Sequence, residues 1–205
     1  TGKSLVIVTK MHYTINIDKE QLMYTLLQSK TLINNTNKTK LLTNNYKQGI
    51  KISHELVNQL NSCDSFCFSV AFINKSGLAV LKQSLINLKD RGIRGKIITS
   101  TYLGFNHPNV FKELLMFDNI EVRIFEDEEI DFHPKGYIFK HDTNFDIIVG
   151  SSNLTQSALS TNQERNIKIQ ANKCDDIVTQ IIGEFDMQWQ HSVPLTKSWI
   201  SEYEK

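Results

Sequence analysis

The chain of 205 residues is 40% hydrophobic and 22% charged, with only 3 prolines, so it can bury a sizeable core and is not a disordered chain. Its longest apolar runs, such as Leu5–Val8, fall far short of the roughly 18 residues that a membrane span needs, and we expect no membrane partner. The 3 cysteines are too few, and odd in number, for a disulfide framework, and no secretory leader is recognised, which predicts a cytoplasmic protein. A net charge of +1 gives no sign of a polyanion partner, so any contact with nucleic acid must come from a local patch.

Residues 1–45 are predicted to form an N-terminal arm and linker. Residues 1–10 precede the first methionine and are either a genuine segment with a short strand or an addition that is not native to the protein. Apolar residues on one helical face predict a helix at Asp18–Ser29. The stretch Thr31–Asn45 is rich in Asn, Thr and Lys, a composition typical of exposed loops, and this places the start of the main domain, residues 46–205, just after Asn45.

From residue 46 onward, helical and strand periodicities alternate along the chain. Helices are expected at Gln48–Asn61, at Ser76–Asp90, from Pro108, at Leu154–Leu159 as a short turn, and from Cys174 to Gln190. Strands are expected at Phe66–Phe72, Gly95–Thr101, Ile120–Phe125, Gly136–Lys140, Phe145–Gly150 and Asn166–Gln170. Strands that alternate with helices, with one closely spaced pair of strands among them, predict an α/β fold with a mixed β-sheet sandwiched between helices.

Two polar motifs flank the closely spaced strands. His133-Pro134-Lys135 lies just before the first strand, and Gly150-Ser151-Ser152-Asn153 lies just after the second. If the two strands form an antiparallel hairpin, both motifs lie at the same end of the sheet. An imidazole that can attack or transfer a proton, an ammonium group, and hydroxyl and amide groups that bind oxygen would then converge, which indicates a phosphate site.

These motifs resemble those of the phospholipase D superfamily, whose members carry a His-x-Lys motif followed by a Gly-Ser-x-Asn element. The stretches Phe132–Phe139 and Gly150–Thr155, with Asn162-x-Glu164 after them, are most similar to the nuclease domains attached to superfamily 2 helicases and to those of metal-independent restriction endonucleases. The resemblance covers residues 47–190. It implies a phospholipase D-like fold, DNA as the substrate, no metal or cofactor, and a place as one module of a helicase or restriction system.

The resemblance also assigns roles to individual residues. His133 would attack phosphorus and form a phosphohistidine, while Lys135, Asn153 and Ser151 would hold the non-bridging oxygens. In the common form of the motif an aspartate stands where this chain has Lys140. In the restriction-enzyme branch a glutamate after the Asn element takes over, and this role of orienting the imidazole would fall to Glu164.

The family site uses two copies of the motif, but no other histidine in this chain is followed by a lysine two residues later. We therefore expect a homodimer in which two His133 rings share one site, one as nucleophile and the other as acid. Two alternatives remain open: a non-catalytic module that binds DNA or phosphate, and a phospholipase-type phosphodiesterase. The residues also have simpler structural interpretations, with Lys135 as a solvated strand end, Ser151 and Asn153 as turn formers, and Glu164 in an exposed ion pair.

Three other groups have both a functional and a structural interpretation. An acidic run can gather a hard cation, although such runs are usually solvated. The cysteines lack the second ligand pair of a zinc site and are expected to be buried apolar residues. Polar and aromatic residues after the second strand either stack on a base or pack beneath their loop. The residues concerned are, in that order, Glu126–Glu129 with Asp131; Cys63, Cys67 and Cys174; and Tyr102, Phe105 and His107.

Overall fold

The computed structural model describes residues 5–8, 14–17, 38–101, 104, 106–127 and 130–205. It divides into two compact units, residues 1–38 and 39–205. In the first unit, β1 (Leu5–Val8) and β2 (Thr14–Ile17) pair as an antiparallel hairpin. The helix predicted at Asp18–Ser29 lies outside the described residues. The second unit begins earlier than the boundary that the sequence suggests after Asn45.

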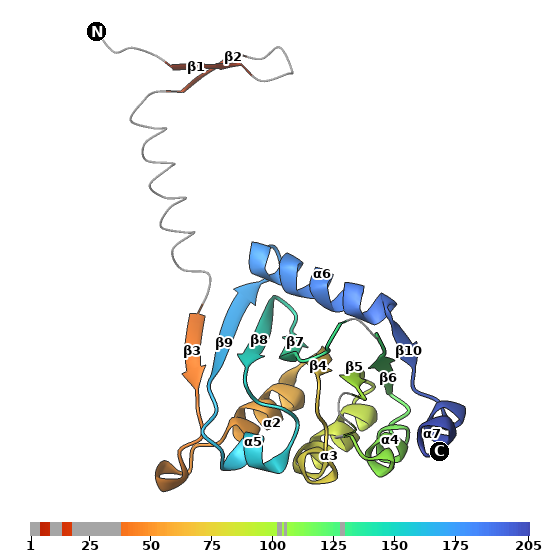
Figure 1. The fold of residues 1–205 in the computed structure, drawn as a ribbon. Coiled ribbons are helices and arrows are strands. Elements are labelled where there is room, and N and C mark those ends of the chain that lie inside the picture. Colours follow the sequence, from red (N-terminus) through yellow and green to blue (C-terminus); the bar gives the residue numbers. More distant parts are fainter. Residues whose placement is uncertain (1–4, 9–13, 18–37, 102–103, 105, 128–129) are drawn as a thin grey trace. The chain divides into compact units, whose positions relative to one another are not determined.

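The second unit is built on an eight-stranded mixed sheet in the order β10-β6-β5-β4-β7-β8-β9-β3 (Figure 1). Its strands are β3 (Lys38–Leu42), β4 (Ser65–Val70), β5 (Arg94–Ser100), β6 (Ile120–Phe125), β7 (Lys135–Lys140), β8 (Asn144–Gly150), β9 (Asn166–Asn172) and β10 (Ser192–Pro194). β4, β5 and β6 are parallel, whereas β7, β8 and β9 follow one another by antiparallel pairing. The predicted α/β class and mixed sheet are confirmed.

Helices cover both faces of this sheet (Figure 1). One face carries α2 (Ile52–Ser62), α3 (Lys75–Asp90), α4 (Pro108–Leu114), α5 (Gln156–Ser160) and α7 (Lys197–Tyr203), and the other carries α6 (Asp176–Gln190). The period-2 alternation of β7 explains the two layers, because Tyr137 and Phe139 belong to the core beneath α2 and α3 while Ile138 belongs to the core beneath α6. No described helix is both long and apolar enough to cross a lipid bilayer.

Two predicted element boundaries are wrong. The stretch predicted as a loop up to Asn45 contains β3, which has no apolar alternation because it is an edge strand whose residues are exposed except for Leu42. The helix predicted from Gln48 begins at Ile52, because the chain first makes a tight turn in which Gly49 has a φ of 66°. That turn is closed by a 2.8 Å hydrogen bond from the Asn45 amide to the Ile50 carbonyl. Only after this turn does the backbone become α-helical.

A buried charged cluster joins α2 to β8 and β9. Asp146 on β8 is 4% exposed, and its carboxylate lies 3.3 Å from His141 Nε2 and 3.4 Å from Lys168 Nζ. Lys168 also donates a 2.8 Å hydrogen bond to Glu55 on α2. Burial raises the pKa of Glu55, but its hydrogen bonds with Lys168 and Gln59 outweigh burial and hold the pKa below its ordinary value. These contacts fix α2 against the strands that carry the candidate site.

Candidate functional site

The two polar motifs lie at the same end of the central strands, and we call this end of the sheet the site edge. β7 and β8 pair antiparallel with Gly136 opposite Val149, so the predicted hairpin is confirmed, and the start of β7 lies beside the end of β8. The pairing of Gly150 with Asn166 brings the start of β9 to the same edge, where β4 ends at Val70. This edge therefore collects His133 and Lys135, Ser151 and Asn153, and the segment that contains Glu164.

His133 and Lys135 contact each other directly. The Lys135 ammonium lies 2.6 Å from His133 Nδ1 and 3.3 Å from Nε2, and it donates a 2.8 Å hydrogen bond to the His133 carbonyl oxygen. Because an ammonium group has no acceptor, the close contact requires an unprotonated ring nitrogen. The ring also packs edge-on against Phe72, with 5.6 Å between the ring centroids. The imidazole and the ammonium are thus held as a pair on the surface of the chain.

Burial lowers the pKa of Lys135, and the negative charge of Glu164 opposes this effect only in part. A bound phosphate would favour the charged ammonium, so phosphate binding should weaken as the pH rises through this lowered pKa. We expect the affinity for inorganic phosphate to be lost over a pH window that lies below the range in which an ordinary lysine loses its proton. Calorimetric titration at several pH values measures it.

Lys135→Arg is the matched control for this titration, because a guanidinium group does not lose its proton in this range. The arginine variant should bind phosphate with nearly constant affinity across the window. Equal pH profiles for the two proteins would show that Lys135 does not titrate at the phosphate site.

The Gly-Ser-x-Asn element is held in place by two buried side chains that the sequence analysis did not identify. Asn166, 1% exposed, accepts a 3.2 Å hydrogen bond from the Ser152 amide and donates a 2.9 Å bond to the Ser152 hydroxyl. The Tyr137 hydroxyl donates a 2.8 Å bond to the Ser152 carbonyl oxygen. Ser152 itself is fully buried, so the element is anchored at its centre, and its flanking residues Ser151 and Asn153 reach the site edge. The sequence signal that could have indicated this role of Asn166 is a polar residue at the first position of a predicted strand.

Asn153 is oriented by the end of β4. Its side-chain oxygen accepts a 3.3 Å hydrogen bond from the Phe72 amide, which leaves its NH2 group as the part of the side chain that can donate to a phosphate oxygen. The Leu154 amide donates a 3.0 Å bond to the Phe72 carbonyl, and the Asn74 amide donates a 3.1 Å bond to the Leu154 carbonyl. This ladder also fixes the distance between the end of β4 and the Gly-Ser-x-Asn element.

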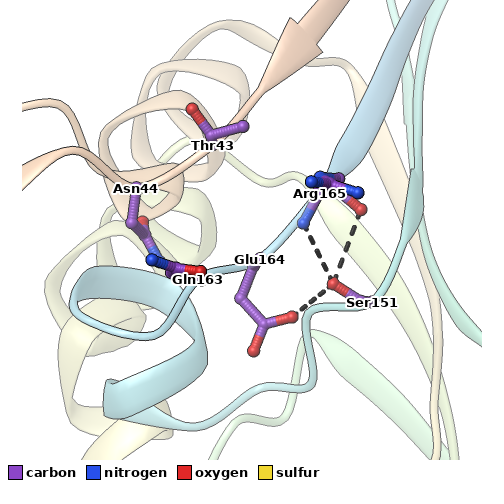
Figure 2. A pocket seen from close by; sticks show the side chains of 6 residues that line it. All are labelled: Thr43, Asn44, Ser151, Gln163, Glu164 and Arg165. Atoms are coloured by element: carbon purple, nitrogen blue, oxygen red, sulfur yellow. Dashed lines mark hydrogen bonds between the residues drawn. The ribbon is translucent and has the colours of Figure 1, made fainter.

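Glu164 contacts Ser151 in the structure (Figure 2). The Ser151 hydroxyl donates a short hydrogen bond to the Glu164 carboxylate and accepts a 3.1 Å bond from the Arg165 amide. The carboxylate is also near enough to Lys135 to influence its pKa. Its role as the partner of the His133 imidazole stays a prediction. Lys140, where the common motif has an aspartate, lies at the opposite end of β7 and is exposed.

The other candidates have structural roles where they are described. Burial raises the pKa of both Cys63 and Cys67 to about 11, but only Cys63 is fully buried as predicted, and Cys67 is half-buried. Cys174 is exposed in the turn before α6, so its predicted burial is wrong. His107 caps α4, since its Nδ1 accepts a 3.2 Å hydrogen bond from the Asn109 amide. Glu126 accepts a 2.7 Å bond from the Trp199 indole.

Two of the predicted groups fall partly outside the described residues. These residues are Tyr102 and Phe105 of the loop after β5, and Glu128 and Glu129 of the acidic run. Within the described part of the chain, no cluster of three His, Cys, Asp or Glu side chains is arranged to hold a metal ion.

The fold resembles solved structures that are remote in sequence. NucT from Helicobacter pylori has a TM-score of 0.60 and 17% identity, over 77% of this chain and 99% of that chain. Nuc from Salmonella typhimurium, a phospholipase D family member, has a TM-score of 0.59 and 16% identity, over 77% and 97% of the two chains. The phosphatidylserine synthase of Haemophilus influenzae has a TM-score of 0.63 and 16% identity, over 78% of this chain and 40% of its own. The domain therefore has the phospholipase D-like fold.

The sequence leads to the same class. Residues 56–189, well over half of the chain, match the family described as "Cardiolipin synthase, PLD-like domain". The chain belongs to this family, and hence to the phospholipase D-like superfamily of phosphodiesterases, as its two motifs predict. Among curated protein sequences, none gives a significant match.

Proposed function

We propose that this protein is a DNA endonuclease that hydrolyses phosphodiesters without a metal ion, through a phosphohistidine formed on His133. The observation that carries the proposal is the contact of His133 with Lys135 at the edge of the sheet that also holds Ser151 and Asn153. DNA as the substrate is supported by the likeness of the two motifs to those of nuclease domains in the same superfamily. The same likeness supports a place as one module of a helicase or restriction system.

The chemistry follows from the charges of a phosphodiester. Its anionic oxygens repel a nucleophile, and its alkoxide leaving group needs a proton. Phosphate oxygens offer the Lys135 ammonium a better acceptor than the His133 ring, so substrate binding would draw the ammonium off the ring nitrogen and free it for attack. The Asn153 NH2 group and the Ser151 hydroxyl would donate to the same oxygens. The electrostatic role that a metal fills in other nucleases would thus fall to Lys135 and these donors.

The reaction needs two histidines with different protonation. One neutral imidazole attacks phosphorus to form the P–N bond while a second, protonated imidazole gives its proton to the leaving oxygen as the P–O bond breaks. The second imidazole, now neutral, then takes a proton from water, whose oxygen displaces the first imidazole and completes hydrolysis. Each chain offers one such motif, so we assign the second histidine to His133 of another copy.

An apolar surface beside His133 supports self-association. A pocket of about 300 Å³ is flanked by Phe132 and Pro134, the two neighbours of His133 in the chain. Ile130 and Met187 line the same pocket and are 61% and 55% exposed. A second copy that faces this His133 would cover them, because a two-fold axis between the rings brings the flanking surfaces together.

Two other functions have support. Binding of DNA without cleavage would use the same donors, and a lipid phosphodiester would fit the same chemistry, which the description of the matched family favours. Assays of DNA, of a small diester and of phospholipid vesicles, all in excess EDTA, separate these functions from the proposal. We expect wild-type protein to cleave plasmid DNA and bis-p-nitrophenyl phosphate in EDTA, with a rate per chain that falls on dilution as the dimer dissociates.

A requirement for added divalent metal would overturn the proposed mechanism. DNA binding with no cleavage of either substrate would support the binding module instead. Hydrolysis of phospholipid vesicles, with DNA left intact, would support the lipid phosphodiesterase.

A further inference from the structure

A second pocket adjoins the candidate site on the side of β9 (Figure 2). It has a volume of about 460 Å³, within the range of pockets that hold small ligands. The residues that line it come from the segment after β3, from just after β8 and from the segment that leads into β9: Thr43, Asn44, Ser151, Gln163, Glu164 and Arg165. Two of them, Ser151 and Glu164, also belong to the site edge. The pocket is therefore continuous with the position where a phosphodiester would bind.

Asn44 holds the wall of this pocket in place. Its NH2 group donates 2.9 Å hydrogen bonds to the carbonyl oxygens of Ala158 on α5 and of Asn162 in the next loop. Its side-chain oxygen accepts a 2.9 Å bond from the Ile52 amide at the start of α2. One side chain thus ties the segment after β3 to the loop that leads into Glu164. Both side-chain N–H donors of Asn44 are used within the protein and its oxygen accepts a bond there too, so its role in the pocket is structural.

Arg165 supplies the positive charge of the pocket. Its backbone is fixed to the site, because the Ser151 amide donates a 3.2 Å bond to its carbonyl oxygen and its own amide donates a 3.1 Å bond to the Ser151 hydroxyl. Its residue surface is nevertheless exposed, as is that of Gln163. The Glu164 carboxylate between them is engaged by the Ser151 hydroxyl. Besides this carboxylate, the lining offers a guanidinium, an amide and a hydroxyl, with no aromatic ring on which a base would stack.

These groups fit the sugar-phosphate part of a nucleic-acid strand. A guanidinium binds phosphate in a bidentate manner, and the amide and hydroxyl groups can hydrogen-bond sugar and phosphate oxygens. A strand carries one phosphate per nucleotide, so a protein that binds one phosphodiester at its reactive site meets the next phosphate close by.

We infer that this pocket binds the nucleotide next to the phosphodiester that is cleaved, with Arg165 on its phosphate and Gln163 and Thr43 on neighbouring oxygens. This inference rests on the proposed function, because it takes the site edge as the position of the reactive phosphate. It assigns to the pocket a contact with the backbone of the strand, which is independent of base sequence. It also places Thr43, which lies in the predicted linker, at the substrate, and gives Asn44 a structural role beside it.

The test measures binding and turnover in the full chain. Binding is followed by fluorescence anisotropy of a labelled single-stranded oligothymidylate at several salt concentrations, with His133→Ala in every protein so that the strand stays intact. Arg165→Gln should weaken this binding about tenfold and reduce the slope of log affinity against log salt concentration by about one. In proteins that retain His133, Arg165→Gln should raise KM for the oligonucleotide and leave turnover of bis-p-nitrophenyl phosphate, which has no neighbouring nucleotide, within about twofold of wild type.

Arg94→Gln is the matched control, since Arg94 is also exposed but begins β5 at the other end of the sheet. It should change neither affinity nor the salt slope. If Arg165→Gln behaves like Arg94→Gln, the inference is wrong.

The binding measurement also separates this inference from the proposed function. If Arg165→Gln lowers the affinity for the oligonucleotide but the wild type cleaves no diester, the binding role of the pocket is supported and the proposed nuclease activity is wrong. If the wild type cleaves the oligonucleotide and Arg165→Gln does not change KM, the nuclease activity is supported and the binding role of the pocket is wrong.

Discussion

Replacement of His133 by alanine should lower hydrolysis of bis-p-nitrophenyl phosphate and of DNA by about 10⁴-fold or more, since both the nucleophile and the acid are lost from the paired site. Because His133 is exposed and makes its polar contacts with Lys135, the variant should keep the thermal stability of the wild type. His133→Gly offers a chemical readout, since added imidazole should restore part of the hydrolysis if the missing group acts in the reaction.

His54→Ala is the control for this variant, because His54 is an exposed histidine of α2 that belongs to neither motif. It should retain wild-type rates. Should His133→Ala hydrolyse diesters as fast as His54→Ala, the assignment of His133 as nucleophile fails.

A methyl group at Gly150 should be among the most damaging small changes in this domain. A Cβ at this position would lie 2.3 Å from the Arg165 carbonyl oxygen and 2.6 Å from the Asn166 Cα, both of which are backbone atoms that cannot rotate away. The clash would push β8 and β9 apart where they carry Ser151 and Glu164. We expect Gly150→Ala to lower the free energy of unfolding by about 3 kcal/mol and to reduce diester hydrolysis by about 10²-fold, measured by urea denaturation and by initial rates.

Gly183→Ala is the same chemical change but is expected to have the opposite effect on the free energy of unfolding. Gly183 lies within α6, and a Cβ there would have no heavy atom within 4 Å beyond its chain neighbours and the backbone of its own helix. Alanine should therefore stabilise the protein, by about 0.5–1 kcal/mol, because it lowers the conformational freedom of the unfolded chain and favours a helix. Equal effects of the two substitutions would show that the close approach of β8 to β9 does not govern this edge.

The fold was predictable where local pattern and tertiary environment agree. The alternation of β7 and the apolar run of β8 predicted the hairpin, because their side chains are divided between the two buried layers of the core. β3 was missed because its pattern is that of an exposed edge, with Leu42 as its buried residue. Its pairing is decided by the neighbouring strand β9, which lies more than a hundred residues further along the chain.

The candidate site was predictable only in its chemical groups. His133, Lys135, Ser151 and Asn153 are polar residues at strand ends, and their spacing identified them. Asn44 acts instead through hydrogen bonds to backbone atoms of Ala158 and Asn162, at sequence separations of 114 and 118 residues. Such contacts leave no local pattern, and an Asn in an Asn-rich stretch indicates a loop. For the same reason, the contact of Glu164 with Ser151 could not be expected from spacing.

Attack on phosphorus by one of two paired His133 imidazoles can be tested by trapping the covalent intermediate. Protein mixed with excess oligonucleotide is unfolded within milliseconds in alkaline denaturant, in which a P–N bond survives, and its peptides are weighed by mass spectrometry. We expect a nucleotidyl group on His133 in at most about half of the chains, since the other ring of each pair acts as the acid. A covalent adduct on any other residue, or rapid hydrolysis without an adduct at any quenching time, would contradict it.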